Sequence, residues 1–400
     1  MTAVLQPHRL ARRLEAVSAS PTLQVMMEAR ALRARGVDVI DFGPGEPDFS
    51  TPENIKRAGL AAIRNDLSHY TETSGLPELR RAIAARYAQR HGCDWTEEEV
   101  FTGCGGKNVL FVLSLALFEP GDRVAIFAPY WVSFPEQVRL CGAEPVLIRT
   151  REEEGFIPRA RDLEPHAGTL KAVILNTPCN PSGAVIPGDE VERLVAFAER
   201  TGAILIADET YDAFHYGPDP FVSFAAHAAR VRDRLILVNS FSKTYAMTGW
   251  RVGYALGPKP ILDGARKVQS HDATHTAVIA QAAAIEAIRG PQESVPAMRE
   301  EYRRRREELA SALNGIRGLA CALPGGAFYL FPNVSGAMRT LGCQTSVALA
   351  QRLMSEIAVA AVPGEAFGAA GYLRLSYALS IDRIRAGAAR LQDLLGARRA

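Results

Sequence analysis

The residues best suited to covalent chemistry lie in one short stretch. Lys243 has the hydroxyl residues Ser240 and Ser242 just before it, and Arg251 follows eight positions later. A lysine amine can form an imine with an aldehyde, whereas hydroxyls and a guanidinium can bind a phosphate. The stretch therefore indicates a site for a molecule that carries both an aldehyde and a phosphate.

Pyridoxal phosphate is the cofactor that carries both groups. The stretch resembles the cofactor-lysine motif of class I aminotransferases, S-x-S-K followed at a variable distance by G-W-R-x-G. The matching residues are Ser240, Ser242, Lys243, Gly249, Trp250, Arg251 and Gly253. A lysine near serines is, taken alone, usually a surface residue, but the full set favours a cofactor site.

Between about residues 75 and 290, apolar runs alternate with helical patterns. Helices are predicted at 77–90, 107–117, 132–141, 189–200 and 276–288, and strands at 124–127, 145–148, 172–175, 204–207, 235–238 and 252–256. This alternation predicts an α/β fold with a mostly parallel sheet that helices cover on both faces. Ligands of such sheets bind beyond the carboxyl ends of the strands. We therefore expect the polar segments 176–180, 208–211 and 240–243 to converge.

After about residue 290 the pattern changes. Helices are predicted at 294–313, 346–357 and 382–395, and short strands at 327–331, 359–362 and 372–376. We expect a smaller α+β domain here, completed by the N-terminal segment. The predicted division is 1–50 for that segment, 51–289 for the large cofactor-binding domain and 290–400 for the small domain.

The N-terminal segment contains one predicted helix at 22–35 and one predicted strand at 37–42. A second helix is expected to begin near Pro52, because proline favours the first turn, with Thr51 as its N-cap.

From about Thr22 to its end, the chain resembles the aspartate-aminotransferase-like family of pyridoxal-phosphate enzymes, class I and II. The resemblance implies fold type I, with a mostly parallel seven-stranded sheet in the large domain. It implies an enzyme that moves an amino group between an amino acid and a 2-oxo acid by a ping-pong mechanism. It also implies a homodimer with shared active sites.

Two further residues would act with Lys243 in catalysis. Asp208, in Ala-Asp-Glu-Thr-Tyr, matches the aspartate of the family motif D-E-x-Y. A carboxylate there can pair with the pyridine nitrogen and keep it protonated. Tyr211 matches the motif's tyrosine, which would donate to the cofactor's phenolic oxygen. The alternative role for Asp208 is a helix N-cap.

A phosphate site is expected where a helix begins after two glycines. Gly105 and Gly106 precede Lys107, and backbone N–H groups at a helix start bind anions. By resemblance this is the phosphate cup of the cofactor site, together with the serines and arginine of the lysine motif. The spacing fits neither a Walker loop nor a dinucleotide-binding fingerprint.

Three more residues match cofactor contacts of the family. Asn180, in the loop N-x-P-x-N-P-S-G, would bind the phenolic oxygen and the substrate carboxylate. Trp131 would stack on the cofactor ring and border the substrate, the alternative being a core aromatic. Tyr70 matches a tyrosine that reaches the phosphate in the neighbouring subunit.

The substrate α-carboxylate has a predicted partner in Arg374, which resembles the arginine of R-[LIV]-S-[FY]. A guanidinium fits a carboxylate with two hydrogen bonds, and the alternative is pairing with a structural acid. Gly45 would offer its backbone to the same carboxylate. Lys107 and Thr22 match residues that contact the distal carboxylate in the bacterial and plant-type aspartate or aspartate/prephenate branch. The alternative is that Thr22 caps the first helix and Lys107 is solvated.

One segment departs from this branch. His275 stands at its usual asparagine, Thr276 at its usual proline, and His271 lies nearby. The departure leaves room for an aromatic or other amino acid as substrate. It also leaves room for a pyridoxal-phosphate oxidase, desaturase or lyase.

Composition excludes several classes of function. The chain has 400 residues, a net charge of +2 and 48% hydrophobic residues, which gives no electrostatic case for nucleic acid or an anionic membrane. The longest apolar run, 109–118, is too short to span a bilayer. The six cysteines show no metal-ligand spacing, and the first residues lack the apolar block of a secretory signal. A cytoplasmic enzyme without metal is expected.

Overall fold

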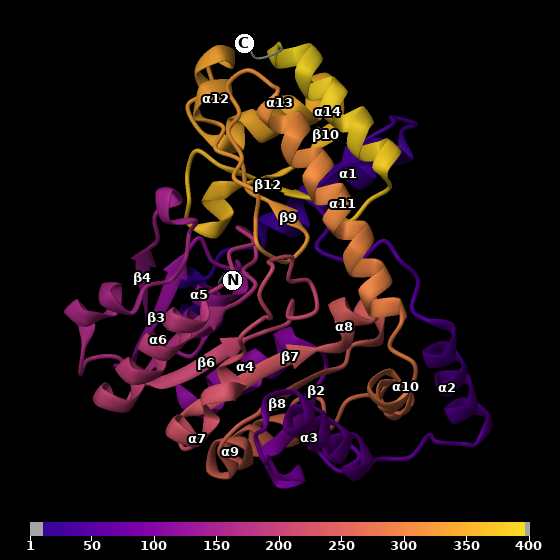
Figure 1. The fold of residues 1–400 in the computed structure, drawn as a ribbon, viewed down its shortest axis with the longest axis vertical. Coiled ribbons are helices and arrows are strands. Elements are labelled where there is room, and N and C mark those ends of the chain that lie inside the picture. Colours follow the sequence, from indigo (N-terminus) through magenta and orange to yellow (C-terminus); the bar gives the residue numbers. More distant parts are fainter. Residues whose placement is uncertain (1–10, 397–400) are drawn as a thin grey trace, which may run out of the picture.

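A seven-stranded sheet forms the centre of the larger part of the chain in the computed structural model, which describes residues 11–396 (Figure 1). In spatial order its strands are β2 (Val100–Gly103), β8 (Gly253–Leu256), β7 (Leu235–Ser240), β6 (Ile204–Asp208), β5 (Ala172–Asn176), β3 (Arg123–Ala128) and β4 (Glu144–Arg149). Only β8 runs antiparallel to its neighbours within this sheet. The predicted mostly parallel seven-stranded sheet is confirmed. The first ten residues, where we expect no secretory signal, lie outside the described part.

Helices cover both faces of the sheet because successive side chains of each strand point to opposite sides. In β5, Val173 and Leu175 pack with one set of helices, whereas Ala172 and Ile174 pack with the other. The first set is α2 (Glu53–Arg64), α3 (Pro77–His91), α6 (Gly188–Thr201), α7 (Ala228–Val231) and α10 (Val278–Arg289). The second set is α4 (Gly106–Leu117), α5 (Ser133–Leu140) and α9 (Lys259–Ser270).

A second apolar core lies in the upper part of Figure 1. Its strands are β9 (Tyr329–Leu330), β11 (Val362–Pro363) and β12 (Leu373–Ser376), in the order β11-β12-β9, and the parallel pair β1 (Ile40–Asp41) and β10 (Val359–Ala360). Its helices are α1 (Pro21–Ala34), α11 (Ser294–Asn314), α12 (Ser335–Leu341), α13 (Ser346–Ile357) and α14 (Ile381–Leu395). The pairing of β1 with β10 joins the N-terminal segment to this part. The domain boundaries at 50 and 289 stay a prediction.

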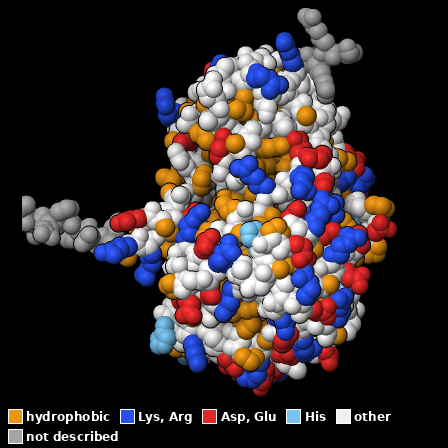
Figure 2. Space-filling view, turned by 90° about the vertical axis from the view of Figure 1, so that its left-hand side faces the viewer, with side chains coloured by type: hydrophobic (Ala, Val, Ile, Leu, Met, Phe, Trp, Pro, Cys, Tyr) orange, Lys and Arg blue, Asp and Glu red, His pale blue; other side chains and the backbone are white. Residues whose placement is uncertain are grey.

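Short elements complete the chain. They are α8 (Phe241–Thr244) and the 3-10 helices η1 (Arg12–Ala16), η2 (Glu97–Glu99), η3 (Glu152–Glu154), η4 (Ala160–His166), η5 (Phe224–His227), η6 (Thr248–Trp250) and η7 (Gly364–Phe367). Among residues 11–396, no helix has the length and apolarity needed to cross a membrane. On the face shown in Figure 2, basic and acidic side chains are interspersed, as the small net charge leads one to expect.

One local prediction is wrong. Thr51 does not cap α2, whose N-cap is Pro52 without a side-chain hydrogen bond. The Thr51 hydroxyl instead donates to the carbonyl of Ala246 at 2.6 Å. A contact between segments distant in the sequence thus takes the place of the local cap.

Candidate active site

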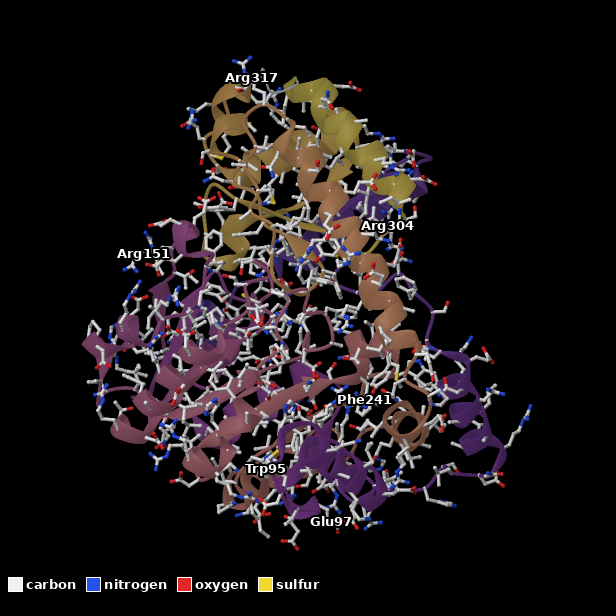
Figure 3. All side chains as sticks on the ribbon, viewed as in Figure 1. Trp95, Glu97, Arg151, Phe241, Arg304 and Arg317 are labelled. Atoms are coloured by element: carbon white, nitrogen blue, oxygen red, sulfur yellow. The ribbon has the colours of Figure 1, made fainter. Side chains whose placement is uncertain are left out.

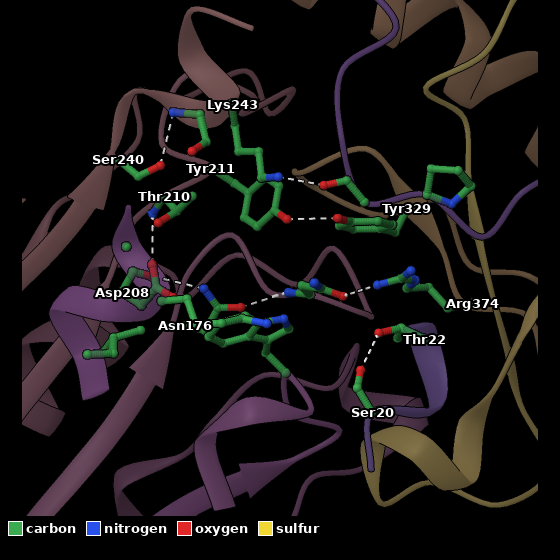
Figure 4. Close-up of a pocket in the computed structure, with 18 of the residues that line it drawn as sticks. Ser20, Thr22, Asn176, Asp208, Thr210, Tyr211, Ser240, Lys243, Tyr329 and Arg374 are labelled. Atoms are coloured by element: carbon green, nitrogen blue, oxygen red, sulfur yellow. Dashed lines mark hydrogen bonds between the residues drawn. The ribbon is translucent and has the colours of Figure 1, made fainter. Parts of the chain in front are cut away.

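A cavity of about 430 Å³ lies where the carboxyl ends of β5, β6 and β7 meet β9 and β12 (Figure 4). Most residues that the sequence singled out line it: Thr22, Gly45, Gly106, Lys107, Trp131, Asn180, Asp208, Tyr211, Ser240, Ser242, Lys243, Arg251 and Arg374. The other two, Gly105 and Tyr70, do not. The expected convergence of the three strand-end segments is confirmed, since each contributes to the lining.

Lys243 directs its amine into this cavity (Figure 4). It lies on α8, which begins directly after β7, and the Ser240 hydroxyl caps that helix by accepting the N–H of Ser242 at 3.0 Å. The amine donates to the carbonyl of Gly45. Burial lowers the pKa of Lys243 to about 8. The unprotonated amine, which a nucleophile or base requires, is therefore far more populated near neutral pH than it is in an ordinary lysine.

Asp208 ends β6 as a buried carboxylate. It accepts the backbone N–H of Thr210 at 3.1 Å. Burial raises the pKa of Asp208 to about 6, although Thr210 and the charge of Lys243 act in the opposite direction. Turns rather than a helix follow β6, so the N-cap alternative is wrong. The carboxylate has acceptor capacity left for a cationic N–H of a ligand.

Tyr211 forms a hydrogen bond of 2.7 Å with the hydroxyl of Tyr329 on β9. Both rings are buried, and burial raises the pKa of each phenol. The two phenols therefore remain protonated. One of them donates the hydrogen bond that they share, so the proton of the other is left to donate into the cavity.

Arg374 lies in the middle of β12 and is buried. Its Nη1 donates to the side-chain oxygen of Asn180 at 3.0 Å, and its Nη2 donates to the carbonyl of Gly43. The guanidinium carbon lies 4.6 Å from the centre of the Tyr329 ring. Burial lowers the pKa of Arg374, and Nε has no hydrogen-bond partner among the described residues. No carboxylate in residues 11–396 forms an ion pair with it, so the alternative of a structural ion pair is wrong.

The turn at Gly105 and Gly106, where α4 begins, packs closely against β8. Gly105 has a φ of +86°, and a Cβ there would lie 2.4 Å from Nη2 of Arg251. A Cβ at Gly253 would lie 2.3 Å from the backbone nitrogen of Gly106. The guanidinium of Arg251 is held by the carbonyls of Thr248 and Cys104 at 2.7 and 3.1 Å. Glycines thus let an arginine approach the N-terminus of α4, a combination that suits a phosphate.

Lys107 and Thr22 both line the cavity. The ammonium of Lys107 is 5.1 Å from the centre of the Trp131 ring, and burial lowers the pKa of this lysine. The hydroxyl of Thr22 is 2.9 Å from that of Ser20, which is the N-cap residue of α1. Since no side chain caps α1, the alternative that Thr22 caps it is wrong. Lys107 is exposed, so the alternative that this side chain is solvated stays open.

The match of the chain to a protein family settles what class of enzyme has this cavity. The model for "Aminotransferase class I and II" matches residues 37–391. The chain belongs to this family.

Relatives that match this aminotransferase over nearly their whole length are named as aspartate or aspartate/prephenate aminotransferases. A probable aspartate/prephenate aminotransferase from Aquifex aeolicus is 40% identical over 389 residues, which cover 96% of this chain and 98% of the relative. The aspartate aminotransferase of Geobacillus stearothermophilus is 38% identical, with 98% of this chain and all of that protein covered.

Solved structures of related enzymes have the same fold. The aspartate aminotransferase from Thermus thermophilus with maleate has a TM-score of 0.91 and 38% identity, covering 97% of this chain and all of that one. The aspartate aminotransferase from Rhizobium meliloti has a TM-score of 0.93 and 34% identity, covering 97% and 99%. The structure of this aminotransferase is therefore similar to theirs throughout.

Class I and II aminotransferases depend on pyridoxal phosphate, and the cavity of this one has the chemistry to hold it. Asp208 is a buried acceptor with spare capacity, and Gly105, which has no side chain, lets Arg251 approach the N-terminus of α4. Lys243, whose pKa is lowered by burial, lines the same cavity and interacts with the charges of both Asp208 and Arg251. Asp208 suits the pyridine nitrogen of the cofactor, and the amine of Lys243 suits its aldehyde. The turn beside Arg251 suits its phosphate.

Tyr70 lies outside the cavity of its own chain, and its side chain is 87% exposed. Its ring packs edge-on against the ring of His275, with centroids 5.6 Å apart. His275 does not line the cavity, and its Nδ1 is 2.8 Å from the carbonyl of Thr276. His271 is exposed. In this aminotransferase the two histidines thus lie away from the described cavity.

The sequence did not single out several lining residues, namely Ser20, Leu23, Met26, Leu110, Asn176, Thr210 and Tyr329. Asn176 is inside the loop that was quoted for Asn180, and its amide donates to the Asp208 carbonyl at 3.0 Å. Tyr329 lies in a strand that was predicted, but nothing local showed that its hydroxyl would meet Tyr211. Only the packing of the small sheet against the large one brings those phenols together.

Proposed function

We propose that this aminotransferase binds pyridoxal phosphate through Lys243 and uses it to move amino groups between a dicarboxylic amino acid and a 2-oxo acid. One observation carries the proposal: an amine, a carboxylate and a guanidinium line one cavity, and they belong to the partly buried Lys243 and the buried Asp208 and Arg374. Buried ionisable groups of this kind cluster at functional sites.

The residues that would hold the cofactor come from several elements. Asp208 would accept the pyridine N–H, Tyr211 and Asn180 would bind the phenolic oxygen, and Trp131 would stack on the ring. The phosphate would bind Gly105, Gly106, Lys107, Ser240, Ser242 and Arg251. When bound, the cofactor supplies an aldehyde for the amino group and a ring that stabilises negative charge at the substrate Cα.

The chain's own residues would orient the substrate and move its proton. Arg374 has donors left to bind the α-carboxylate, with Asn180 and the backbone of Gly45 beside it. The amine of Lys243, whose pKa is lowered to about 8, would accept the proton from the substrate Cα. The burial of Arg374 keeps water from its guanidinium, which strengthens the ionic contact that would hold the substrate.

The proposal of a dicarboxylic substrate rests on Lys107 and Thr22. Both line the cavity, and their ammonium and hydroxyl suit a second carboxylate. The names of the relatives, which include aspartate aminotransferases, support the same class of substrate.

We further propose a homodimer that works in the cytoplasm. The exposed Tyr70, outside its own cavity, is available to a second copy of the chain, where it would reach the phosphate. The six cysteines are free, which suits a reducing compartment.

Half-reactions test the proposed function directly. The purified enzyme with cofactor is mixed with L-aspartate, L-glutamate or L-phenylalanine, and the absorbance of the cofactor is followed together with keto-acid formation. We expect rapid conversion with the two dicarboxylic amino acids. Absence of any spectral change with all three would contradict the function, and conversion with phenylalanine alone would contradict the substrate class.

A further inference from the structure

Residues 43–51, which we call the strap, contact both parts of the molecule in alternation. The carbonyl of Gly43 accepts the guanidinium of Arg374, and the carbonyl of Gly45 accepts the amine of Lys243. Two carbonyls that are two residues apart thus bind the principal cation of each side of the cavity. The position of the strap therefore affects both cations.

The strap is also attached to the segment that follows Lys243. The carboxylate of Glu46 accepts the hydroxyl of Thr248 at 2.8 Å. The hydroxyl of Thr51 donates to the carbonyl of Ala246 and accepts the indole N–H of Trp250 at 3.1 Å. These contacts hold the strap at Glu46 and at Thr51 against the large part of the molecule.

Between these attachments, Asp48 fixes the strap to α11. Nη1 of Arg305 lies 2.9 Å from both carboxylate oxygens of Asp48, and the hydroxyl of Tyr302 lies 3.2 Å from one of them. Nε of Arg305 donates to Glu301 at 2.8 Å. The Arg305 side chain is only 8% exposed, so this pair is less screened by water than an ordinary surface ion pair. Figure 3 shows α11 running down from the upper part, with the neighbouring Arg304 labelled.

Aromatic rings continue this attachment toward the cavity. The guanidinium of Arg305 lies 5.3 Å from the Phe49 ring and 5.5 Å from the Tyr302 ring. Tyr302 packs against Phe328, with centroids 5.5 Å apart, and Phe328 packs against Tyr211 at 5.3 Å. The ion pair therefore contacts both the strap and the buried rings that support the cavity phenols.

We propose that Asp48 and Arg305 are positioning residues, which hold Gly45 in place between Lys243 and Arg374. The inference rests on the proposed function, because Gly45 is assigned there to the substrate α-carboxylate. The backbone at Gly45 packs tightly, since a Cβ on it would lie 2.8 Å from the hydroxyl of Tyr329. A small shift of the strap therefore changes the distances around the proposed site for the substrate α-carboxylate. Such a shift strongly weakens binding of the substrate in its reactive orientation.

Two measurements on the enzyme with bound cofactor test this proposal. Asp48→Asn removes the charge that attracts Arg305, and Arg303→Gln on the exposed side of α11 is the matched control. Hydrogen exchange reports the protection of the strap amides, and half-reaction kinetics give the apparent Kd for the amino acid and the limiting rate. We expect faster exchange in residues 43–51 and an apparent Kd raised about tenfold, with the limiting rate changed less than about twofold. Arg303→Gln is expected to match the wild type in both measurements.

Unchanged exchange of the strap in Asp48→Asn would overturn the proposal, and so would a lowered limiting rate with an unchanged Kd. If Asp48→Asn does not fold, Arg305→Lys replaces it, because a lysine keeps the charge and loses the planar contacts to both rings. For Arg305→Lys too, unchanged exchange of the strap, or a lowered limiting rate with an unchanged Kd, would overturn the proposal. Failure of the proposed function can be told apart from failure of this proposal. A wild type that converts no amino acid would contradict the function, whereas hydrogen exchange would still show whether Asp48 holds the strap.

Discussion

Arg374 on β12 donates a hydrogen bond of 3.0 Å to the side-chain oxygen of Asn180, which follows β5. The bond crosses the cavity and joins the three-stranded sheet to the seven-stranded one. It holds the guanidinium in place before a ligand arrives, while Nε remains without a partner in the described chain. Such preorganisation lowers the cost of binding a carboxylate.

Arg374→Lys is expected to raise the KM for the amino acid by about 100-fold while the visible absorbance of the bound cofactor persists. Lysine keeps the charge but cannot bind Asn180, Gly43 and a carboxylate in one plane. Steady-state kinetics and an absorption spectrum check this. An unchanged KM would remove Arg374 from the substrate site.

Lys243→Ala is expected to abolish turnover, with a loss of more than about 1,000-fold, because no other amine lies at that position of the cavity wall. The visible absorbance that depends on the lysine is expected to disappear as well. Reduction of the wild type with borohydride, followed by peptide mapping, gives the complementary evidence. A label on any residue other than Lys243 would contradict the assignment.

Asp208→Asn is expected to stabilise the cofactor-free protein near neutral pH. The pKa of Asp208 is raised by burial from 3.8 to about 6, so between these values the folded state binds more protons than the unfolded state. Stability therefore falls as pH rises through this window. Above about pH 6, the ionised carboxylate of Asp208 lowers the free energy of unfolding by up to about 3 kcal/mol.

The measurement is thermal unfolding of both cofactor-free proteins at pH 4 and pH 7. The variant is expected to have the higher Tm at pH 7 and no such advantage at pH 4, where the wild-type carboxyl is largely protonated. In the loaded enzyme the same variant is expected to lose activity. An equal difference in Tm at the two pH values would show that Asp208 does not titrate in this window.

Lys107→Ala tests the class of substrate. If Lys107 binds a distal carboxylate, the KM for aspartate is expected to rise about 10- to 100-fold, because a charged hydrogen bond is lost. The KM for phenylalanine is expected to change much less. Equal changes for both amino acids would contradict the contact with the distal carboxylate and leave Lys107 with the cofactor phosphate alone.

Mixing two inactive variants tests whether the sites are shared. In a mixed dimer of Tyr70→Phe and Lys243→Ala chains, one site would combine the intact lysine of one chain with the intact Tyr70 of the other. Partial recovery of activity after mixing and refolding is expected, at up to about a quarter of the wild-type value when chains pair at random. Light scattering checks the mass, and a monomer would contradict the proposal.

Regular elements could be predicted because their patterns are local. The range 346–357 was predicted for the helix that forms α13 (Ser346–Ile357), and the strands of the large sheet differ by one or two residues at their ends. The strand β2 was missed because its four residues, Val-Phe-Thr-Gly, are too short for a clear alternation. α9 was also missed, although its buried residues share one helix face, which is the local pattern typical of a surface helix.

Site residues could be predicted where a sequence motif specifies each position. They could not be predicted where a contact forms only through packing between distant segments. The cavity contains Lys243 and Asp208 as expected from their places after β7 and in β6. Tyr329 and Asp48 escaped notice because a tyrosine in a strand and an aspartate in a turn are common. Their partners, Tyr211 and Arg305, lie more than 100 positions away, so no local pattern connects them.

The close contact between Gly253 and the backbone of Gly106 has a consequence for how the protein matures. The anion-binding turn is complete only after β8 has inserted between β2 and β7, because its two halves lie about 150 positions apart in the chain. A partly assembled sheet would offer the phosphate no such turn. The vitamin-derived cofactor would then bind the finished protein alone and, by mass action, shift the population toward it.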